Sequence, residues 1–185
     1  KTYHHLDDVE KRMDSVADLK AVRLAVGARD DVDDSRIGVF GRSYGGFMVN
    51  WLVGHTNIFR AAASQRSISN WTSFYGASDI GYFFAFDQNK TGWEDETVFS
   101  ALWDHSPLKY VRSAKTPTLV LHSDEDYRCP LDQGVQFFTG LVDAGVTTRL
   151  VVFSQENHEL SRSGKPQARV RRLKEITTWF EKHGK

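Results

Sequence analysis

One short stretch of the chain joins an apolar run to a glycine-rich turn: residues 36–45 read RIGVFGRSYG. Residues 36–40 form an apolar run between turn residues, which is typical of a buried parallel strand. Gly41 to Gly45 form the pattern G-x-S-x-G, and residues 47–53 have helical character. A serine on a sharp strand-to-helix turn adopts strained backbone geometry, and its hydroxyl stands clear of the sheet. The position of the pattern therefore predicts that Ser43 is a nucleophile.

The glycines and the helix around Ser43 have expected roles of their own. Gly41 and Gly45 would let neighbouring backbone approach more closely than a side chain allows. The following helix would direct the positive end of its dipole toward a developing oxyanion, with the N–H of Tyr44 as one donor. A phosphate-binding loop is the rival interpretation, but it needs Lys-Ser or Lys-Thr after its last glycine. Phe-Met stands there instead, which favours an oxyanion-binding turn.

Strands and helices alternate through the rest of the chain. Further buried strands are predicted at residues 59–64, 117–122 and 149–153, and helices at residues 6–27, 131–141 and 166–182. In such an alternation successive strands run parallel, and the helices that connect them cover both faces of the sheet. The sequence therefore predicts an α/β protein with a doubly wound, mostly parallel sheet.

Aromatic residues crowd the segment between Trp71 and Trp103, which is too long to be a tight connection. The rings are those of Trp71, Phe74, Tyr75, Tyr82, Phe83, Phe84, Phe86 and Trp93. We expect an insertion of short helices over the edge of the sheet. Most of the rings are expected to pack in the core, and a minority to line an apolar binding pocket.

The composition argues against several classes of partner. The chain has 185 residues, which suits one domain with one core, and 24 basic residues balance 24 acidic ones. A balanced charge gives no electrostatic reason to expect binding to nucleic acid or to an anionic membrane. No stretch approaches the roughly 20 apolar residues of a membrane span. Cys129 is the only cysteine, so no internal disulfide can form and a cytoplasmic location is expected.

A serine nucleophile needs a base, and the base needs a carboxylate to orient it. In the α/β-hydrolase fold the chain order is serine, acid and histidine, with the last two on loops that follow strands. His158 is the only histidine that follows a predicted strand downstream of an acidic loop, so it is the expected base. Asp124, Glu125 and Asp126 share that loop, and their spacing does not separate them.

No metal or other cofactor is expected. His4 and His5 lie near two aspartates, but no further ligand follows at a suitable spacing. The acidic run at residues 30–34 lacks the central glycine of a calcium loop. His55 is expected to cap the end of a helix, and His122 to place its ring against the core.

The stretch GRSYGGFM at residues 41–48 resembles the nucleophile turn of the prolyl oligopeptidase family, in particular its acylaminoacyl-peptidase branch. The resemblance continues through residues 54–56, 106–111 and 126–130, in the same order, and covers nearly the whole chain. It implies an α/β-hydrolase fold and a serine peptidase. Such an enzyme would hydrolyse short or acylated peptides through an acyl-enzyme, with no cofactor.

The resemblance also implies roles for single residues. In the D-x-R-x-P motif at residues 126–130, Asp126 would be the acid of the triad, and Arg128 would hold a substrate carbonyl near the scissile bond. The residues that would line the primary specificity pocket are Ile68, Trp71, Phe74 and Tyr75. An apolar pocket of this kind suits a bulky hydrophobic side chain. For Arg128 an ion pair with Asp124 or Glu125 is the alternative.

A complete family member would carry further strands and a β-propeller ahead of these residues. The chain starts at Lys1 without a methionine, so residues 1–185 are expected to be the C-terminal part of a catalytic domain. The expected partner, besides a peptide substrate, is the missing N-terminal portion or a second copy bound at the exposed sheet edge. Two alternatives stay open: a carboxylesterase with the same triad, and a fragment that is inactive without its N-terminal portion.

Overall fold

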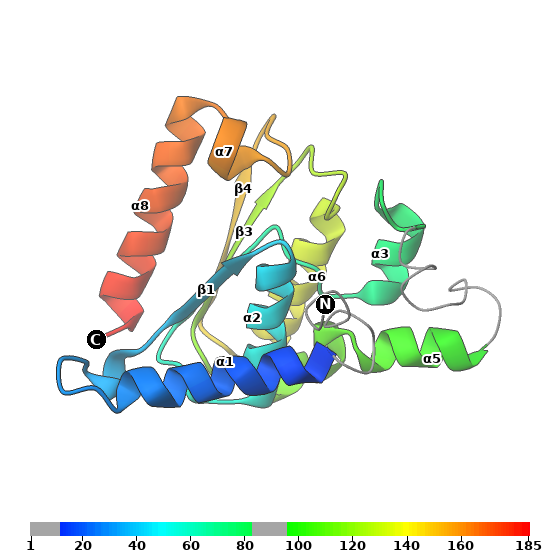
Figure 1. Cartoon of the computed structure of the whole chain (residues 1–185). Coiled ribbons are helices and arrows are strands. Elements are labelled where there is room, and N and C mark those ends of the chain that lie inside the picture. Colours follow the sequence, from blue (N-terminus) through cyan, green and yellow to red (C-terminus); the bar gives the residue numbers. More distant parts are fainter. Residues whose placement is uncertain (1–11, 83–95) are drawn as a thin grey trace, which may run out of the picture.

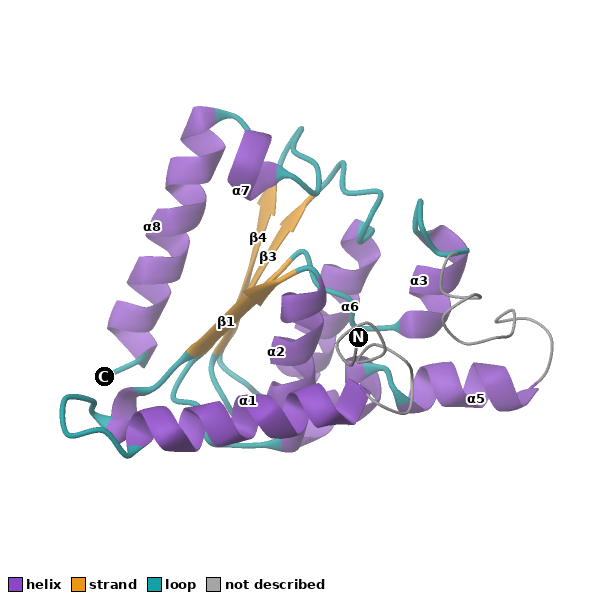
Figure 2. Cartoon of the chain, viewed as in Figure 1, coloured by secondary structure: helices purple, strands orange, loops and turns teal. Residues whose placement is uncertain are grey.

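The computed structural model of the chain describes residues 12–82 and 96–185, and this part contains a sheet of four parallel strands (Figure 1). The strands are β1 (Val39–Arg42), β2 (Ala62–Gln65), β3 (Thr118–Ser123) and β4 (Thr148–Phe153). They lie in this order across the sheet, each one paired in parallel with the next. Helices cover both of its faces (Figure 2). The predicted α/β fold with a parallel sheet is confirmed.

The strand before the turn at Ser43 begins at residue 39, later than the predicted residue 36. A short 3-10 helix, η2 (Asp34–Arg36), precedes it, and the carboxylate of Asp33 accepts the backbone N–H two residues on at 3.0 Å. Such a side-chain contact stabilises a turn at the expense of extended structure. The strand therefore begins at Val39, and it extends through Arg42, directly up to Ser43.

One face of the sheet is covered by the C-terminal helix. The elements on this side are α7 (Leu160–Ser163) and α8 (Pro166–His183). Ile176 of α8 is buried in a cluster with Leu119 and Leu121 of β3. Side chains alternate between the two faces of a strand, so Val120, which lies between these leucines, belongs to the cluster on the other side. All six residues of β3 are buried because helices cover both faces.

The opposite face is covered by the helices that follow β1 and β3 and by a 3-10 helix that precedes β3. They are α2 (Tyr44–His55), η3 (Pro107–Ser113) and α6 (Leu131–Asp143). Val49 of α2 and Phe137 of α6 are buried together with Val120 of β3. This packing fixes α2, and with it the turn at Ser43, against the end of the sheet.

A third buried cluster lies on the outer side of α2. The helices around it are α1 (Arg12–Gly27), α3 (Trp71–Ala77) and α5 (Glu96–Asp104). Val16, Trp71 and Leu102, one from each of these helices, are buried with Phe47 and Leu52 of α2. Figure 1 shows α3 and α5 on the far side of α2 and α6 from the sheet. The short helices expected in the aromatic segment are present, but they pack on α2 and not over the edge of the sheet. The predictions for residues 6–11 and for Phe83, Phe84, Phe86 and Trp93 lie outside the described residues.

Strand β1 forms one edge of the sheet, and Phe40 on this strand is 65% exposed. An edge strand presents backbone N–H and C=O groups that can pair with another strand. Within the described residues, the sheet is therefore open at β1, next to the Ser43 turn. Within the same residues, no helix is both long and apolar enough to cross a membrane.

Leu52 and Leu173 provide a matched test of the core. Leu52 on α2 is fully buried, whereas Leu173 on α8 is 55% exposed. Leu52→Ala is expected to lower the free energy of unfolding by about 3 kcal/mol, because it removes buried methyl groups and leaves a cavity. Leu173→Ala is expected to change it by less than about 0.5 kcal/mol. Urea unfolding measures both, and equal losses would contradict this core.

Candidate active site

Ser43 occupies the turn between β1 and α2 with a φ of 57° and a ψ of −124°. A positive φ is rare for a residue with a side chain, and it stores strain. Two main-chain hydrogen bonds hold the turn: the Ser43 N–H donates to the Gln65 carbonyl at 2.9 Å, and the Ser43 carbonyl accepts the Phe47 N–H at 3.0 Å. Together they keep the strained residue at the carboxyl end of the sheet, as its sequence pattern predicts.

Two glycines make this turn sterically possible, but only one of them was predicted. A Cβ on Gly41 would lie 2.2 Å from the Gly45 carbonyl oxygen, so a side chain does not fit there. A Cβ on Gly45 would meet nothing within 4 Å, so the close approach predicted at that position is wrong. The second crowded position is Gly46, whose Cβ would lie 2.7 Å from Cβ of Ser67 and 2.8 Å from the Gln65 carbonyl oxygen. This crowding arises where α2 passes the end of β2, a contact that a local pattern does not contain.

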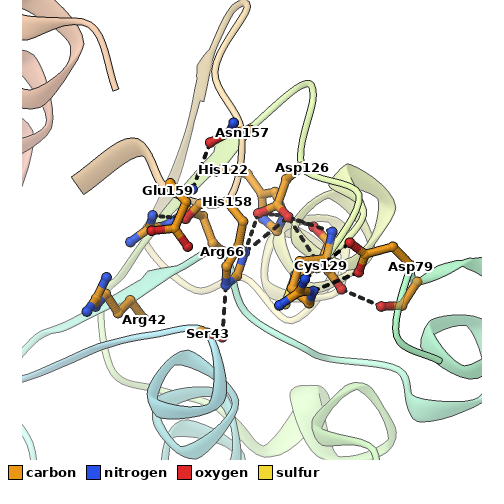
Figure 3. Close-up of polar contacts among 12 residues, drawn as sticks. Arg42, Ser43, Arg66, Asp79, His122, Asp126, Cys129, Asn157, His158 and Glu159 are labelled. Atoms are coloured by element: carbon orange, nitrogen blue, oxygen red, sulfur yellow. Dashed lines mark hydrogen bonds and ion pairs between the residues drawn. The ribbon is translucent and has the colours of Figure 1, made fainter. Parts of the chain in front are cut away.

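Three side chains from the residues that follow β1, β3 and β4 meet at the carboxyl end of the sheet (Figure 3). Nε2 of His158 lies 3.0 Å from Oγ of Ser43, and Nδ1 lies 2.8 Å and 3.0 Å from the two oxygens of Asp126. This network assigns the proton to Nδ1, which donates to the carboxylate, so that Nε2 can accept the serine O–H. The side chain of Asp126 is fully buried and that of His158 is 15% exposed. The imidazole therefore remains reachable from outside while its carboxylate partner is shielded from water.

The three acidic residues of the loop after β3 differ in their exposure and in their hydrogen-bond partners. Asp124 is exposed, and its carboxylate accepts hydrogen bonds at 2.6 Å and 2.9 Å from the loop after β4. Glu125 is exposed as well. Asp126 points inward, and its Oδ1 also accepts the backbone N–H groups of Arg128 at 3.1 Å and Cys129 at 2.8 Å. Of the three, only Asp126 contacts the imidazole.

His122 supports the turn that carries Asp126, a contact that sequence reasoning missed. Its ring is fully buried, as predicted, and Nε2 donates to the Cys129 carbonyl at 2.8 Å. The same atom lies 4.0 Å from Oδ2 of Asp126. Burial lowers the pKa of His122, so the ring stays neutral. The ring packs closely against α6, where a Cβ on Gly134 would lie 2.5 Å from Nδ1. His122 therefore acts as a fixed donor that closes the turn.

Arg66 is a second residue that sequence reasoning missed. It directly follows β2 with a φ of 44° and is 1% exposed. Its guanidinium donates to the carbonyl oxygen of His158, 92 positions away, and at 3.1 Å to Oγ of Ser161. The preceding residue, Gln65, accepts the N–H of Ser43. Two consecutive residues thus hold the main chain of both Ser43 and His158, which fixes the separation of the serine and the imidazole.

Arg128 forms an ion pair with Asp79, a residue of the loop after α3. Its Nε and Nη2 donate to the two carboxylate oxygens at 2.7 Å and 3.3 Å. The alternative prediction, an ion pair with Asp124 or Glu125, is therefore wrong. Both side chains of the pair are nearly half exposed. The contact between Arg128 and a substrate carbonyl stays a prediction.

The four residues predicted to line a pocket lie on α3 or just before it. Ile68, Trp71 and Phe74 are buried at 4%, 1% and 1% exposure and belong to the core cluster around Phe47. The ring centroids of Trp71 and Phe47 lie 5.2 Å apart in an edge-on contact. Tyr75 is partly exposed. These residues form a packed aromatic wall beside the site, and their contact with a ligand stays a prediction.

His55 has the local contact that its position in the sequence predicts. His55 ends α2, where its Nδ1 bonds to the Trp51 carbonyl at 2.8 Å and its ring stacks on the indole. This contact closes the last turn of the helix, as predicted. Among residues 12–82 and 96–185, no group of three or more side chains is placed to hold a metal ion. His4 and His5 lie outside these residues.

Comparison of the sequence with known families and proteins gives consistent matches. A family described as the prolyl oligopeptidase family matches residues 1–185. The uncharacterized peptidase YuxL of Bacillus subtilis is 49% identical over 165 residues, which are 89% of this chain and 25% of that protein. The acylamino-acid-releasing enzyme of Arabidopsis thaliana is 33% identical over 177 residues, 91% of this chain and 23% of the relative.

Solved structures show the same similarity in three dimensions. The acylaminoacyl peptidase of Pyrococcus horikoshii superimposes with a TM-score of 0.80 and 34% identity, over 89% of this chain and 27% of that one. An acylaminoacyl peptidase in complex with Z-Gly-Gly-Phe-chloromethyl ketone gives a TM-score of 0.79 and 35% identity, over 88% and 26%. The α/β-hydrolase fold is thereby confirmed. The chain spans about a quarter of the length of the relatives that it matches.

Arg66→Met is expected to slow the reaction of Ser43 with a fluorophosphonate by about tenfold to a hundredfold, because small displacements of a base are costly. Arg60→Met is the matched control, since Arg60 is exposed and its guanidinium bonds to a main-chain oxygen of Lys185, away from Ser43 and His158. The stoichiometry of labelling counts intact sites, and the rate constant reports their geometry. Full stoichiometry with a reduced rate is the expected outcome, and an unchanged rate would contradict the positioning of His158 by Arg66.

The buried neutral ring of His122 predicts a pH dependence of stability. The unfolded chain binds a proton at this histidine below a pH of about 6.5, whereas burial lowers the pKa of His122 in the folded chain. The free energy of unfolding is therefore expected to fall as the pH drops below about 6.5, and to be independent of this group above it. His122→Gln retains a donor but no titrating ring, so the loss between pH 7.5 and 5.5 should be smaller. Thermal unfolding across this range measures it, and an identical pH dependence in the variant would contradict the prediction.

Proposed function

Because the chain belongs to the prolyl oligopeptidase family, we propose that it hydrolyses short or acylated peptides by acyl transfer to Ser43. The observation that carries the proposal is the continuous series of hydrogen bonds from Ser43 Oγ through His158 to Asp126. A serine hydroxyl is a weak nucleophile until a base within hydrogen-bond distance takes its proton. The carboxylate in turn holds the imidazole in the tautomer that can do so.

In the first step, Ser43 Oγ forms a bond to the carbonyl carbon of the scissile peptide bond, and its proton passes to Nε2 of His158. Asp126 stabilises the imidazolium that results. When the tetrahedral intermediate collapses, the C–N bond breaks and His158 gives this proton to the departing amine. A water molecule then attacks the acyl-enzyme with the same imidazole as base, which releases the acid and restores the serine hydroxyl.

The oxyanion of the tetrahedral intermediate needs hydrogen-bond donors on the side of the first turn of α2. Tyr44 is the first residue of this helix, and its N–H is the proposed donor. The positive end of the helix dipole acts at the same place. One such donor is typically worth about 3 kcal/mol of transition-state stabilisation.

The aromatic wall and Arg128 favour a peptide with a bulky apolar side chain on the acyl side. Of the four residues predicted to line the pocket, Tyr75 is partly exposed and would contact that side chain, with Ile68, Trp71 and Phe74 packed behind it in the core. Arg128 would contact a backbone carbonyl of the substrate. A related acylaminoacyl peptidase was solved with a blocked peptide that ends in phenylalanine, which supports this choice. Asp79 would orient Arg128 through the ion pair that the two side chains form.

Residues 1–185 are proposed to be the C-terminal part of a cytoplasmic catalytic domain. The relatives are about four times as long as the matched region, and β1 has an open edge beside Ser43. The proposed partner at this edge is the N-terminal portion of the same protein. A second copy of the chain is the alternative occupant, and the mass of the particle in solution distinguishes the two.

A substrate pair tests the function. The chain is expected to cleave both a blocked phenylalanine anilide, which is an amide, and the corresponding ester. Ser43→Ala should lower both rates by at least about 10⁴-fold, since removal of a triad member leaves only residual catalysis. Ser113→Ala, at an exposed serine, is the matched control and should leave both rates unchanged. Cleavage of the ester without the amide would identify a carboxylesterase instead.

Intact mass after exposure to a fluorophosphonate separates the remaining alternative. A single adduct that is absent in Ser43→Ala and in His158→Ala is the expected outcome. Folded protein that forms no adduct would mean that the N-terminal portion is needed to complete the site, and the proposal for the isolated chain would be wrong.

A further inference from the structure

Three arginines converge on one side of Ser43 with no carboxylate as a hydrogen-bond or ion-pair partner among the described residues. Arg42 ends β1, Arg66 follows β2, and Arg172 lies on α8. Arg42 bonds to Ser161 Oγ, and Nε of Arg172 bonds to the side-chain oxygen of Gln65 at 2.9 Å. Arg66 bonds to the His158 carbonyl and to Ser161 Oγ, while its buried Nε has no partner. All these acceptors are uncharged, so no direct hydrogen-bond partner neutralises the positive charge of the cluster.

The Ser161 hydroxyl shows how closely two of these groups approach. Nη1 of Arg42 donates to its Oγ at 3.0 Å and Nη2 of Arg66 at 3.1 Å, so these nitrogens lie within about 6 Å of each other. A hydroxyl oxygen has two lone pairs, and both are used here by cationic donors. Like charges at this separation repel strongly unless an anion lies between them.

The effect on the arginines themselves supports this repulsion. Burial, followed by the charges of Arg172 and Arg42, lowers the pKa of Arg66 to about 10. The nearby carboxylates are engaged elsewhere: Glu159 pairs with Arg162, and Asp126 with His158. Asp126 and Glu159 act in the opposite direction and raise the pKa of Arg66, but among the described residues neither forms an ion pair with an arginine of the cluster. They therefore offset only part of the positive charge, and an additional anion at the cluster would be stabilised.

If Arg128 and the aromatic wall bind the acyl side of a peptide, the cluster lies on the side of its leaving group. Arg42 is adjacent to Ser43 in sequence, and Arg66 contacts the carbonyl of His158, the residue that protonates the departing amine. In Figure 3, Arg42 lies on the opposite side of the Ser43–His158 pair from Asp79, which binds Arg128 on the proposed acyl side. The two sides of a bound peptide would thus meet different chemistry, with an aromatic wall on one side and free positive charge on the other.

We propose that Arg42 and Arg172 bind the terminal carboxylate of the leaving peptide, and that Arg66 behind them adds its charge. Arg42 is exposed and Arg172 half-buried, so a ligand can reach both. An arginine next to the nucleophile lies within reach of a leaving peptide of about one to three residues, since each extended residue spans about 3.5 Å. The inference rests on the proposed function, and it makes the chain selective for short peptides with a free C-terminus.

A pair of substrates that differ only at the C-terminus tests the site. Two blocked peptides with a phenylalanine on the acyl side and a dipeptide leaving group are compared, one as the free acid and one as the amide. The acid is expected to have a kcat/KM about tenfold higher, a preference that decreases as ionic strength rises from 0.05 to about 0.5 M because the attraction is screened. Equal values for acid and amide would overturn the proposal. An acidic segment of the protein that already occupied the cluster would also give equal values, and the proposal would then be wrong.

Substitutions locate the preference. In Arg42→Gln combined with Arg172→Gln, the ratio of acid to amide should fall to about one, whatever the effect on the absolute rates. Arg149→Gln combined with Arg171→Gln is the matched control, since it also removes two positive charges, from guanidiniums that pair with Glu175. Its ratio should equal that of the unsubstituted chain. A preference that survives in the double variant would contradict the assignment to these arginines.

A binding measurement keeps this inference distinct from the proposed function. The free dipeptide acid and its amide are titrated into Ser43→Ala protein, and NMR shifts or calorimetry report the affinities. The acid is expected to bind about tenfold more tightly, and the double arginine variant should lose the difference. If neither peptide substrate is cleaved but the acid binds selectively, the proposed activity fails and the carboxylate site stands. If the substrates are cleaved but the acid is not bound more tightly than the amide, the proposed activity stands and the carboxylate site fails.

Discussion

The hydrogen bond from the N–H of Ser43 to the carbonyl of Gln65 is the contact on which the rest of the site depends. It joins the ends of β1 and β2 and holds Ser43 at a positive φ, with its hydroxyl beyond the sheet. Gly41 and Gly46 make the contact possible, because a side chain at either position would overlap neighbouring backbone. Since all four strands are parallel, the loops after β3 and β4 reach the same edge and bring the acid and the imidazole to this hydroxyl.

Backbone strain is concentrated at the carboxyl end of the sheet. Among the described residues, the non-glycine positions with positive φ are Ser43, Arg66 and Gln155, which lie just after β1, β2 and β4. Strain of this kind persists only where surrounding contacts determine the conformation. The N–H of Arg66 donates to the Leu121 carbonyl at 2.8 Å, and the N–H of Gln155 to the carboxylate of Asp124 at 2.6 Å. The chain has no net charge, but Arg42, Arg66 and Arg172 lie together near this end of the sheet without an ion-pair partner among the described residues. The local charge there is therefore positive although the charge of the whole chain is balanced.

Local sequence patterns were sufficient for the order of strands and helices and for the serine and histidine of the site. The apolar run before Ser43 and the glycines after it specify a strand, a turn and a helix through neighbours only a few positions apart. His158 follows from the order of loops along the chain. Family resemblance, rather than spacing, singled out Asp126 from the two acids beside it.

Only the tertiary structure decided which side chains support these residues. The need for a glycine at position 46, the fixed donor at His122 and the pairing of Arg128 with Asp79 all depend on elements that are distant in sequence. Arg66 is the clearest case, because a buried arginine after a short strand carries no local signal until it meets the carbonyl of His158, 92 positions away. The amino-acid sequence by itself determined the local conformations and the order of Ser43, Asp126 and His158 along the chain. Their separations and charges were set by packing, since hydrogen bonds and burial act between surfaces that meet only in the folded chain.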